Sequence, residues 1–128
     1  MNSILIDTTV FISVLRKHLP SQNFLNAHLD YVMSYVTYGE LLQGSFNKQE
    51  KKKVVQIANN SKIHWGSESI HKKACEIVLQ YGPSHGVGFF DALITATAME
   101  EGLTLVTDNV KHFQMIKGLK VRKPGKYG

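Results

Sequence analysis

The sequence predicts an α/β fold in which a mainly parallel sheet is covered by helices on both faces. Short apolar runs alternate with longer segments of helical periodicity along the 128 residues. Parallel strands need helical crossovers, and strands buried on both faces are continuously apolar. The segment 91–102 is apolar on nearly every side of a helix, which indicates a helix that lies against the sheet.

The first half of the chain contains two predicted strand–helix units. Residues 3–6 form the first strand, and Thr8 or Thr9 caps a helix from Val10 to His18 that Leu19-Pro20 ends. The pattern then predicts a short helix over 21–28, a strand over 31–35, a helix over 37–46 and a basic helix over 48–59.

The second half continues the alternation without a linker, so we expect a single domain over residues 1–128. A strand around 63–65 precedes an amphipathic helix capped by Ser67. Further along, the sequence predicts a loop over 81–88, the buried helix from Asp91 to Gly102, a strand over 103–107, a short helix up to Phe113 and an edge strand over 119–121.

Composition narrows the class of protein. Fifteen Lys and Arg against ten Asp and Glu give a formal charge of +5, which favours a polyanionic partner or substrate. No apolar run is long enough to span a membrane, and the N-terminus does not resemble a signal peptide, so a cytoplasmic protein is expected. The single cysteine, Cys75, is interpreted as a small core residue.

Four of the ten acidic residues occupy related places in this fold. Asp7 and Asp108 follow predicted strands, while Glu40 lies in the first turn of a helix and Asp91 begins the buried helix. Because the carboxyl ends of parallel strands meet at one edge, all four should reach that edge. Each also has a structural explanation: a helix cap for Asp7 and Asp91, an Asx turn for Asp108, and a capping box with Thr37 for Glu40.

A crevice of carboxylates has a definite chemistry. Like charges in a partly buried site repel, so the carboxylates either take up protons or hold a divalent cation. Oxygen ligands favour Mg²⁺ or Mn²⁺, and neither a histidine pair nor a Cys-x-x-Cys motif supports zinc. Such a site suits phosphodiester hydrolysis by a metal-activated water, with the basic excess binding the other phosphates of a nucleic acid.

Three stretches resemble the PIN-domain ribonucleases, and within them the VapC toxins of toxin–antitoxin pairs: ILIDTTVFI (4–12), YVTYGELLQG (35–44) and FFDALITATAMEEGLTLVTDNVKHFQMIKGLKV (89–121). The resemblance implies a three-layer α/β/α sandwich and an endoribonuclease dependent on Mg²⁺ or Mn²⁺. It also implies a homodimer, a VapB-like antitoxin that blocks the site, and RNA, often transfer or ribosomal RNA, as substrate.

Carried over by position, the resemblance makes Asp7, Glu40 and Asp91 catalytic, metal-binding acids. It places the hydroxyl of Thr107 beside them. Thr9 departs from the family pattern, which usually has asparagine there, so any hydrogen bond from this position comes from a hydroxyl.

The fourth acid of the family usually falls where this chain has Asn109. Asp108 stands one place earlier and is kept as a catalytic candidate. Asn109 is a candidate to orient a metal-bound water.

Other functions fit the sequence less well. A haloacid-dehalogenase-like phosphatase needs a second carboxylate where Thr9 stands, and a response-regulator receiver needs an early acidic pair. A PIN-like domain that binds RNA or protein without cleaving it stays as the alternative. The basic segment 51–53 either contacts RNA phosphates or forms a solvated helix face. Trp65 is interpreted as a packing residue. The six histidines are scattered and are interpreted as unrelated to the site.

Overall fold

The computed structural model describes residues 3–28 and 30–125. In that part of the chain five strands form one sheet in the order β3-β2-β1-β4-β5, and every neighbouring pair is parallel. The strands are β1 (Ile4–Ile6), β2 (Val32–Ser34), β3 (Lys62–His64), β4 (Thr104–Val106) and β5 (Val121–Arg122). The predicted parallel sheet is confirmed, with β1 at its centre between β2 and β4.

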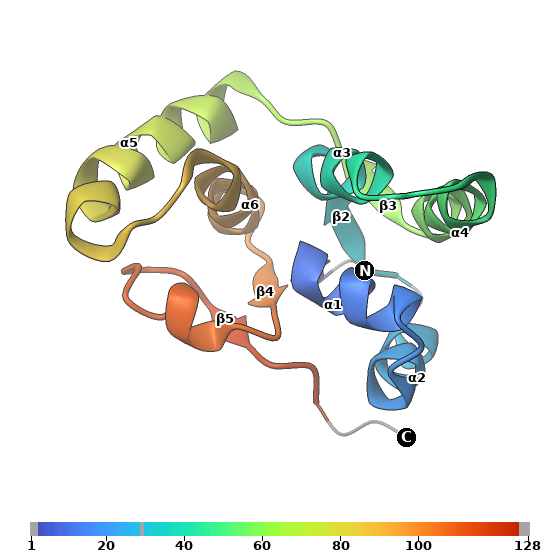
Figure 1. Cartoon of the computed structure of the whole chain (residues 1–128). Helices are drawn as coiled ribbons and strands as arrows, with labels where there is room; N and C mark the ends of the chain where they lie inside the picture. The colour runs from blue at the N-terminus through green and yellow to red at the C-terminus, as the bar shows by residue number, and fades with distance from the viewer. Residues whose placement is uncertain (1–2, 29, 126–128) are drawn as a thin grey trace.

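Helices cover both faces of this sheet (Figure 1). They are α1 (Thr8–Leu15), α2 (Leu19–Ala27), α3 (Tyr35–Gln43), α4 (Lys48–Asn59), α5 (Glu68–His85) and α6 (Phe89–Glu100), with a 3₁₀ turn, η1 (Val110–His112), after β4. Figure 1 shows α5 and α6 together on one side, whereas α1 and α2 lie on the other. The three-layer α/β/α sandwich is therefore confirmed.

The pleat of β1 explains why its sequence is continuously apolar. Leu5 packs into the cluster that contains residues of α5 and α6, while Ile4 and Ile6 pack into the cluster of α1 and α2. Successive side chains of a strand point to opposite faces, so a strand between two helical layers needs apolar residues at every position.

The starts of two helices differ from the prediction. Helix α1 begins at Thr8, so Asp7 is its N-cap residue and neither Thr8 nor Thr9 caps it. Helix α3 begins at Tyr35, and the hydroxyl of Ser34 accepts from the Val36 amide at 3.2 Å. The capping box proposed for Thr37 and Glu40 is wrong. In both cases the helix starts at once where the strand ends, without the separate capping turn that the sequence pattern suggested.

Helix α5 is longer than predicted and replaces part of the expected loop over 81–88. It runs through Pro83 to His85 and ends at Gly86, whose φ of 67° lies in the left-handed region. Pro83 removes one amide donor only two residues before that end, which limits the disruption. Cys75 is exposed rather than in the core, since the next position after the buried Ala74 turns away from the apolar stripe.

Helix α6 begins at Phe89 with Gly88 as its N-cap, so Asp91 lies in the first turn instead of at the cap. Gly102, with a φ of 65°, follows its end as predicted. Within residues 3–28 and 30–125, no helix combines the length and apolar character needed to cross a membrane.

The cap of α5 offers a test of the fold. The Ser67 hydroxyl accepts from the Ile70 amide at 3.2 Å, so Ser67→Ala should lower the free energy of unfolding by about 1 kcal/mol in urea denaturation. Ser84→Ala changes an exposed hydroxyl near the other end of this helix and should change stability by less than about 0.5 kcal/mol. Equal effects of the two substitutions would contradict the capping role of Ser67.

Candidate active site

Asp7 lies where β1 ends and α1 begins, and it is only 3% exposed. Its amide donates to the Val106 carbonyl at 2.8 Å, which links the end of the central strand β1 to its neighbour β4. Its Oδ2 accepts from the hydroxyl of Thr107 at 2.8 Å and from that of Thr9 at 2.9 Å. The threonine at position 9 therefore supplies a hydroxyl donor to the first acid.

Burial and charge act against ionisation of Asp7. Desolvation raises the pKa of its carboxyl above the usual 3.8, the hydroxyls of Thr107 and Thr9 lower it in part, and the charge of Asp91 raises it further. A buried carboxylate that is destabilised by another carboxylate gains from any cation placed between them.

Glu40 belongs to the first two turns of α3 and faces the same edge of the sheet. Its Oε1 accepts from the Thr8 hydroxyl at 2.8 Å, and that hydroxyl lies 3.0 Å from the Thr37 hydroxyl. Desolvation raises the pKa of Glu40, the Thr8 bond lowers it, and the charges of Asp91 and Asp7 raise it. Glu40 is thus electrostatically coupled to both other acids.

Asp91 projects from the first turn of α6, and its Oδ2 lies 2.7 Å from Nε2 of His112 in η1. His112 was not among the predicted site residues, because the six histidines are scattered along the sequence. The available signal was its place five residues after the LVT strand, within the stretch that resembles the family. Thr8 and Thr37 were not predicted as hydrogen-bond partners, because their contacts join segments that are distant in the sequence.

Asp108 does not join the other acids. Its Oδ2 accepts from the Ser13 hydroxyl of α1 at 2.9 Å, and its amide donates to Thr9 Oγ1 at 3.2 Å. It is not among the charges that shift the pKa of Asp7 or Glu40. The neighbouring Asn109 amide donates to Thr107 Oγ1 at 3.0 Å, so its backbone is linked to the Asp7 site.

The donor set of this edge fits a hard divalent cation. Asp7, Glu40 and Asp91 offer oxygen ligands only, and no lysine or arginine within the described residues forms an ion pair with any of them. Their side chains are not fully converged: among residues 3–28 and 30–125, no three Asp, Glu, His or Cys side chains form a ligand cluster. Hydroxyls and His112 instead hold the individual carboxylates.

Comparisons with known proteins agree with this architecture. A family model described as PIN domain matches residues 4–118. The chain is 33% identical over 121 residues to Ribonuclease VapC10 of Mycobacterium tuberculosis, covering 91% of this chain and 90% of that protein. It is 30% identical over 126 residues to Ribonuclease VapC1 of Rickettsia felis, covering 92% of this chain and 93% of that protein.

A solved toxin–antitoxin complex from Klebsiella pneumoniae contains a chain of the same fold. The TM-score is 0.81 at 24% identity, and the match covers 98% of this chain and 100% of that one. The family model matches most of the sequence, and the two relatives match along nearly their full length. The chain belongs to the PIN-domain family and, within it, groups with the VapC proteins.

Proposed function

We propose that this protein is a divalent-metal-dependent endoribonuclease and the toxin of a toxin–antitoxin pair. The observation that carries the proposal is that Asp7, Glu40 and Asp91, which come from three separate elements, lie at one edge of the sheet, where the charge of Asp91 raises the pKa of both Asp7 and Glu40. The names of the two relatives, both ribonucleases that match along nearly their whole length, support RNA as the substrate.

In this mechanism the three carboxylates would hold Mg²⁺ or Mn²⁺, and a bound ion would lower the pKa of an attacking water and offset charge on the phosphate that is cut. Thr9 and Thr107 orient the Asp7 carboxylate, and Thr8 orients Glu40. These hydroxyls hold the acids in place before the substrate arrives, so that less reorganisation is needed.

Residues around the acids complete the proposed machinery. His112 holds one oxygen of Asp91 at the rim of the site. The Asn109 amide donates to Thr107 Oγ1, and its side chain is proposed to bind substrate or orient the attacking water. Asp108 is assigned a smaller role, because its carboxylate is bound to Ser13.

The proposal extends to partners. The Klebsiella relative in fold is part of a toxin–antitoxin complex, which supports a VapB-like antitoxin that covers the acidic crevice. A homodimer, a cytoplasmic location, and transfer or ribosomal RNA as the target complete the proposal.

One observation favours the alternative, a PIN-like domain that binds RNA or protein without cleaving it. The acids of the described residues do not already form a converged ligand cluster. The coupling among the acids favours the enzyme, because a binding-only surface would gain nothing from buried carboxylates that repel one another and the RNA phosphates. Cleavage assays with single variants distinguish the two functions.

Removing any one of the three coupled acids should abolish cleavage. We expect purified wild-type protein to cut RNA with Mg²⁺ or Mn²⁺, and Asp7→Asn, Glu40→Gln and Asp91→Asn to lower the rate at least about a hundredfold, since each loses a metal-binding charge. The measurement is the initial cleavage rate of a labelled RNA, with circular dichroism to show that each variant is folded.

Two controls accompany these variants. Glu68→Gln alters an exposed acid of α5 and should leave the rate unchanged. Asp108→Asn should do less harm than Asp91→Asn, and the reverse order would show that Asp108 is the principal third acid. A wild-type cleavage rate in Glu40→Gln would mean that Glu40 has only a structural role. If the wild-type protein left RNA uncut both with and without added metal, only the binding function would remain.

The raised pKa of Asp7 predicts a stability change without metal. In the unfolded chain the pKa of Asp7 is near 3.8, and in the folded protein it is higher, so the folded state binds this proton more tightly. Ionised Asp7 therefore opposes folding. The free energy of unfolding falls as the pH rises from 3.8 through the pKa of the folded state. Asp7→Asn removes that charge and keeps an oxygen to accept from the threonines. Its melting temperature in EDTA should therefore exceed that of the wild type at pH 7, with a smaller difference at pH 4.

A lower melting temperature for Asp7→Asn at pH 7 would contradict this account. It would mean that the charge-assisted hydrogen bonds from Thr9 and Thr107 outweigh the cost of burying the carboxylate.

The toxin role predicts an effect in cells. Expression of the wild type alone should arrest growth and produce new 5′ ends at a defined place in cellular RNA, whereas Asp7→Asn should do neither. Sequencing of RNA 5′ ends identifies the target. Growth arrest by both proteins, with no new ends, would contradict RNA cleavage as the cause.

A further inference from the structure

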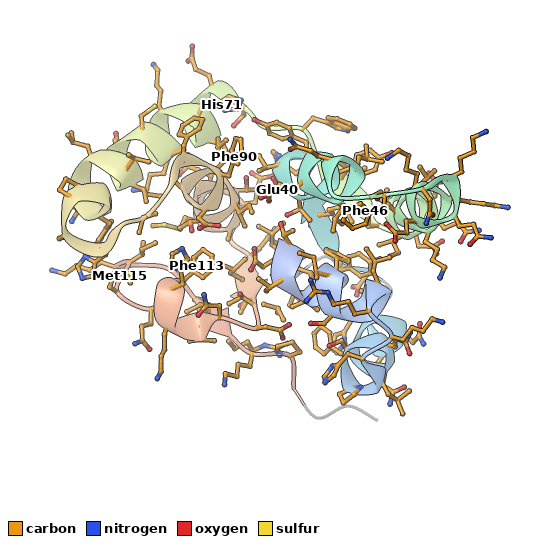
Figure 2. The ribbon with its side chains drawn as sticks, viewed as in Figure 1. Glu40, Phe46, His71, Phe90, Phe113 and Met115 are labelled. Carbon is orange, nitrogen blue, oxygen red and sulfur yellow. The ribbon has the colours of Figure 1, made fainter. Side chains whose placement is uncertain are left out.

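A groove of about 570 Å³ is lined by Glu40 but by neither Asp7 nor Asp91, so it adjoins the acidic crevice at Glu40. One wall is the end of α1, with Arg16 and Lys17, and the other comprises the α3–α4 connection and the side of α4 that carries Lys53. Figure 2 labels two of its lining residues, Glu40 on α3 and Phe46 on the connection to α4. We call it the α1–α4 groove.

Three positive side chains line the α1–α4 groove, one from each of Arg16, Lys17 and Lys53, and all three residues are exposed. They come from two helices that are separate in sequence, so the cluster is a product of the fold rather than of a basic run. Lys51, from the same basic segment, donates instead to the Ser45 carbonyl at 2.8 Å. Of the segment 51–53, Lys53 is the residue that lines the groove.

The backbone places Lys17 there at a cost. Its φ is 63°, a left-handed conformation that a residue with a side chain seldom adopts, and its amide donates to the Val14 carbonyl at 3.0 Å. Glycine would fill this position with less strain. A lysine at such a position brings a charge to the groove wall directly after Arg16.

The acidic residues that face the same groove are Glu40 and Glu50. Glu40 belongs to the proposed metal site. Glu50 has a local task, since its Oε2 accepts from the Phe46 amide at 2.7 Å while its own amide donates to Asn47 Oδ1 at 2.9 Å. The three cations therefore outnumber the acids, and one of the two acids is placed where a metal ion would offset its charge.

Phe46 adds a second kind of contact. Its ring is 93% exposed, the highest value among the large apolar side chains exposed in the described part of the chain. The bond from its amide to Glu50 fixes the backbone that carries it. A flat ring presented to solvent beside positive charges is the combination by which proteins bind single-stranded nucleic acid, with bases on the ring and phosphates on the cations.

We propose that the α1–α4 groove binds the substrate as a single strand of RNA, with Arg16, Lys17 and Lys53 on its phosphates and a base stacked on Phe46. This inference rests on the proposed ribonuclease function and names the residues outside the acidic crevice that bind the RNA. The strand passes Glu40, so a phosphate follows it into the acidic crevice. Base-paired RNA keeps its bases stacked inside the helix and has none to offer to Phe46.

Charge favours RNA over a protein occupant. A peptide that matched this groove would need acidic side chains at the spacing of the three cations and would then bring negative charge toward Glu40. An RNA strand carries its charge at every nucleotide, and the phosphate nearest Glu40 is the one that a divalent cation would share.

The test measures binding of a fluorescent single-stranded RNA of about 12 nucleotides, long enough for one such site, by anisotropy with EDTA present so that no strand is cut. Arg16→Gln with Lys53→Gln should weaken binding about tenfold. It should also reduce the slope of log K against log salt concentration by about 1.4, because each phosphate contact with a single strand contributes about 0.7.

The matched control is Lys72→Gln with Lys73→Gln on α5, which removes the same charge from an exposed pair with Glu68 and a partly exposed pair with Glu76 on the opposite helical layer. It should leave both affinity and slope near the wild-type values. Phe46→Ala should weaken single-stranded binding about tenfold, leave the salt slope unchanged and leave the binding of a duplex of the same sequence unaffected.

The outcomes separate this inference from the proposed function. If the groove variant, Arg16→Gln with Lys53→Gln, kept the wild-type RNA affinity and salt slope, the inference would be overturned even if the protein cleaves RNA. If that variant also lost binding of a co-expressed antitoxin, the groove would be assigned to a protein partner. Equal losses in the groove variant and the α5 control would also overturn it, because only total charge would matter. Weakened binding in the groove variant alone would support the inference even if the wild type failed to cleave.

Discussion

Thr107 and Thr9 donate to one oxygen of Asp7 while the Asp7 amide is bound to Val106, and this buried junction connects the neighbouring strands β1 and β4 to the start of α1. The backbone bond joins Asp7 to β4, so the sheet fixes the position of the residue that carries the carboxylate. Its burial raises its own pKa, which makes the ionised form a cost to folding. Sites that serve function commonly tolerate such a cost, and here it prepares a place for positive charge.

Parallel topology brings the remaining acids to this junction. Glu40 follows β2 and Asp91 lies before β4, so the elements on either side of β1 each deliver one carboxylate to the edge where the strands end. Each acid is held by a partner from elsewhere in the sequence: Thr8 for Glu40 and His112 for Asp91. The proposed RNA groove starts at Glu40, so binding of the strand and cleavage of the strand would share one residue.

Most of the architecture could be predicted because it depends on patterns within short segments. The apolar runs and helical stripes located the sheet and its helices, including α4 at Lys48–Asn59 and the Ser67 cap. Errors arose where a local signal competed with the fold: Ser34 rather than Thr37 caps α3, and Pro83 lies inside α5. The placement of Asp7, Glu40 and Asp91 at one edge of the sheet could be expected from topology. The His112 contact and the hydrogen bond of Asp108 to Ser13 depend on side-chain geometry that no sequence spacing contains.

Calorimetric titration of the protein with Mn²⁺ is the measurement that tests most directly the central claim that the coupled carboxylates form a cation site. The account predicts saturable binding to the wild type and to Glu68→Gln. It also predicts proton release that grows as the buffer pH approaches the raised pKa values of Asp7 and Glu40, because the metal displaces their protons. Binding should be lost in Glu40→Gln. Equal binding by wild type and Glu40→Gln, or no binding by the wild type, would contradict it.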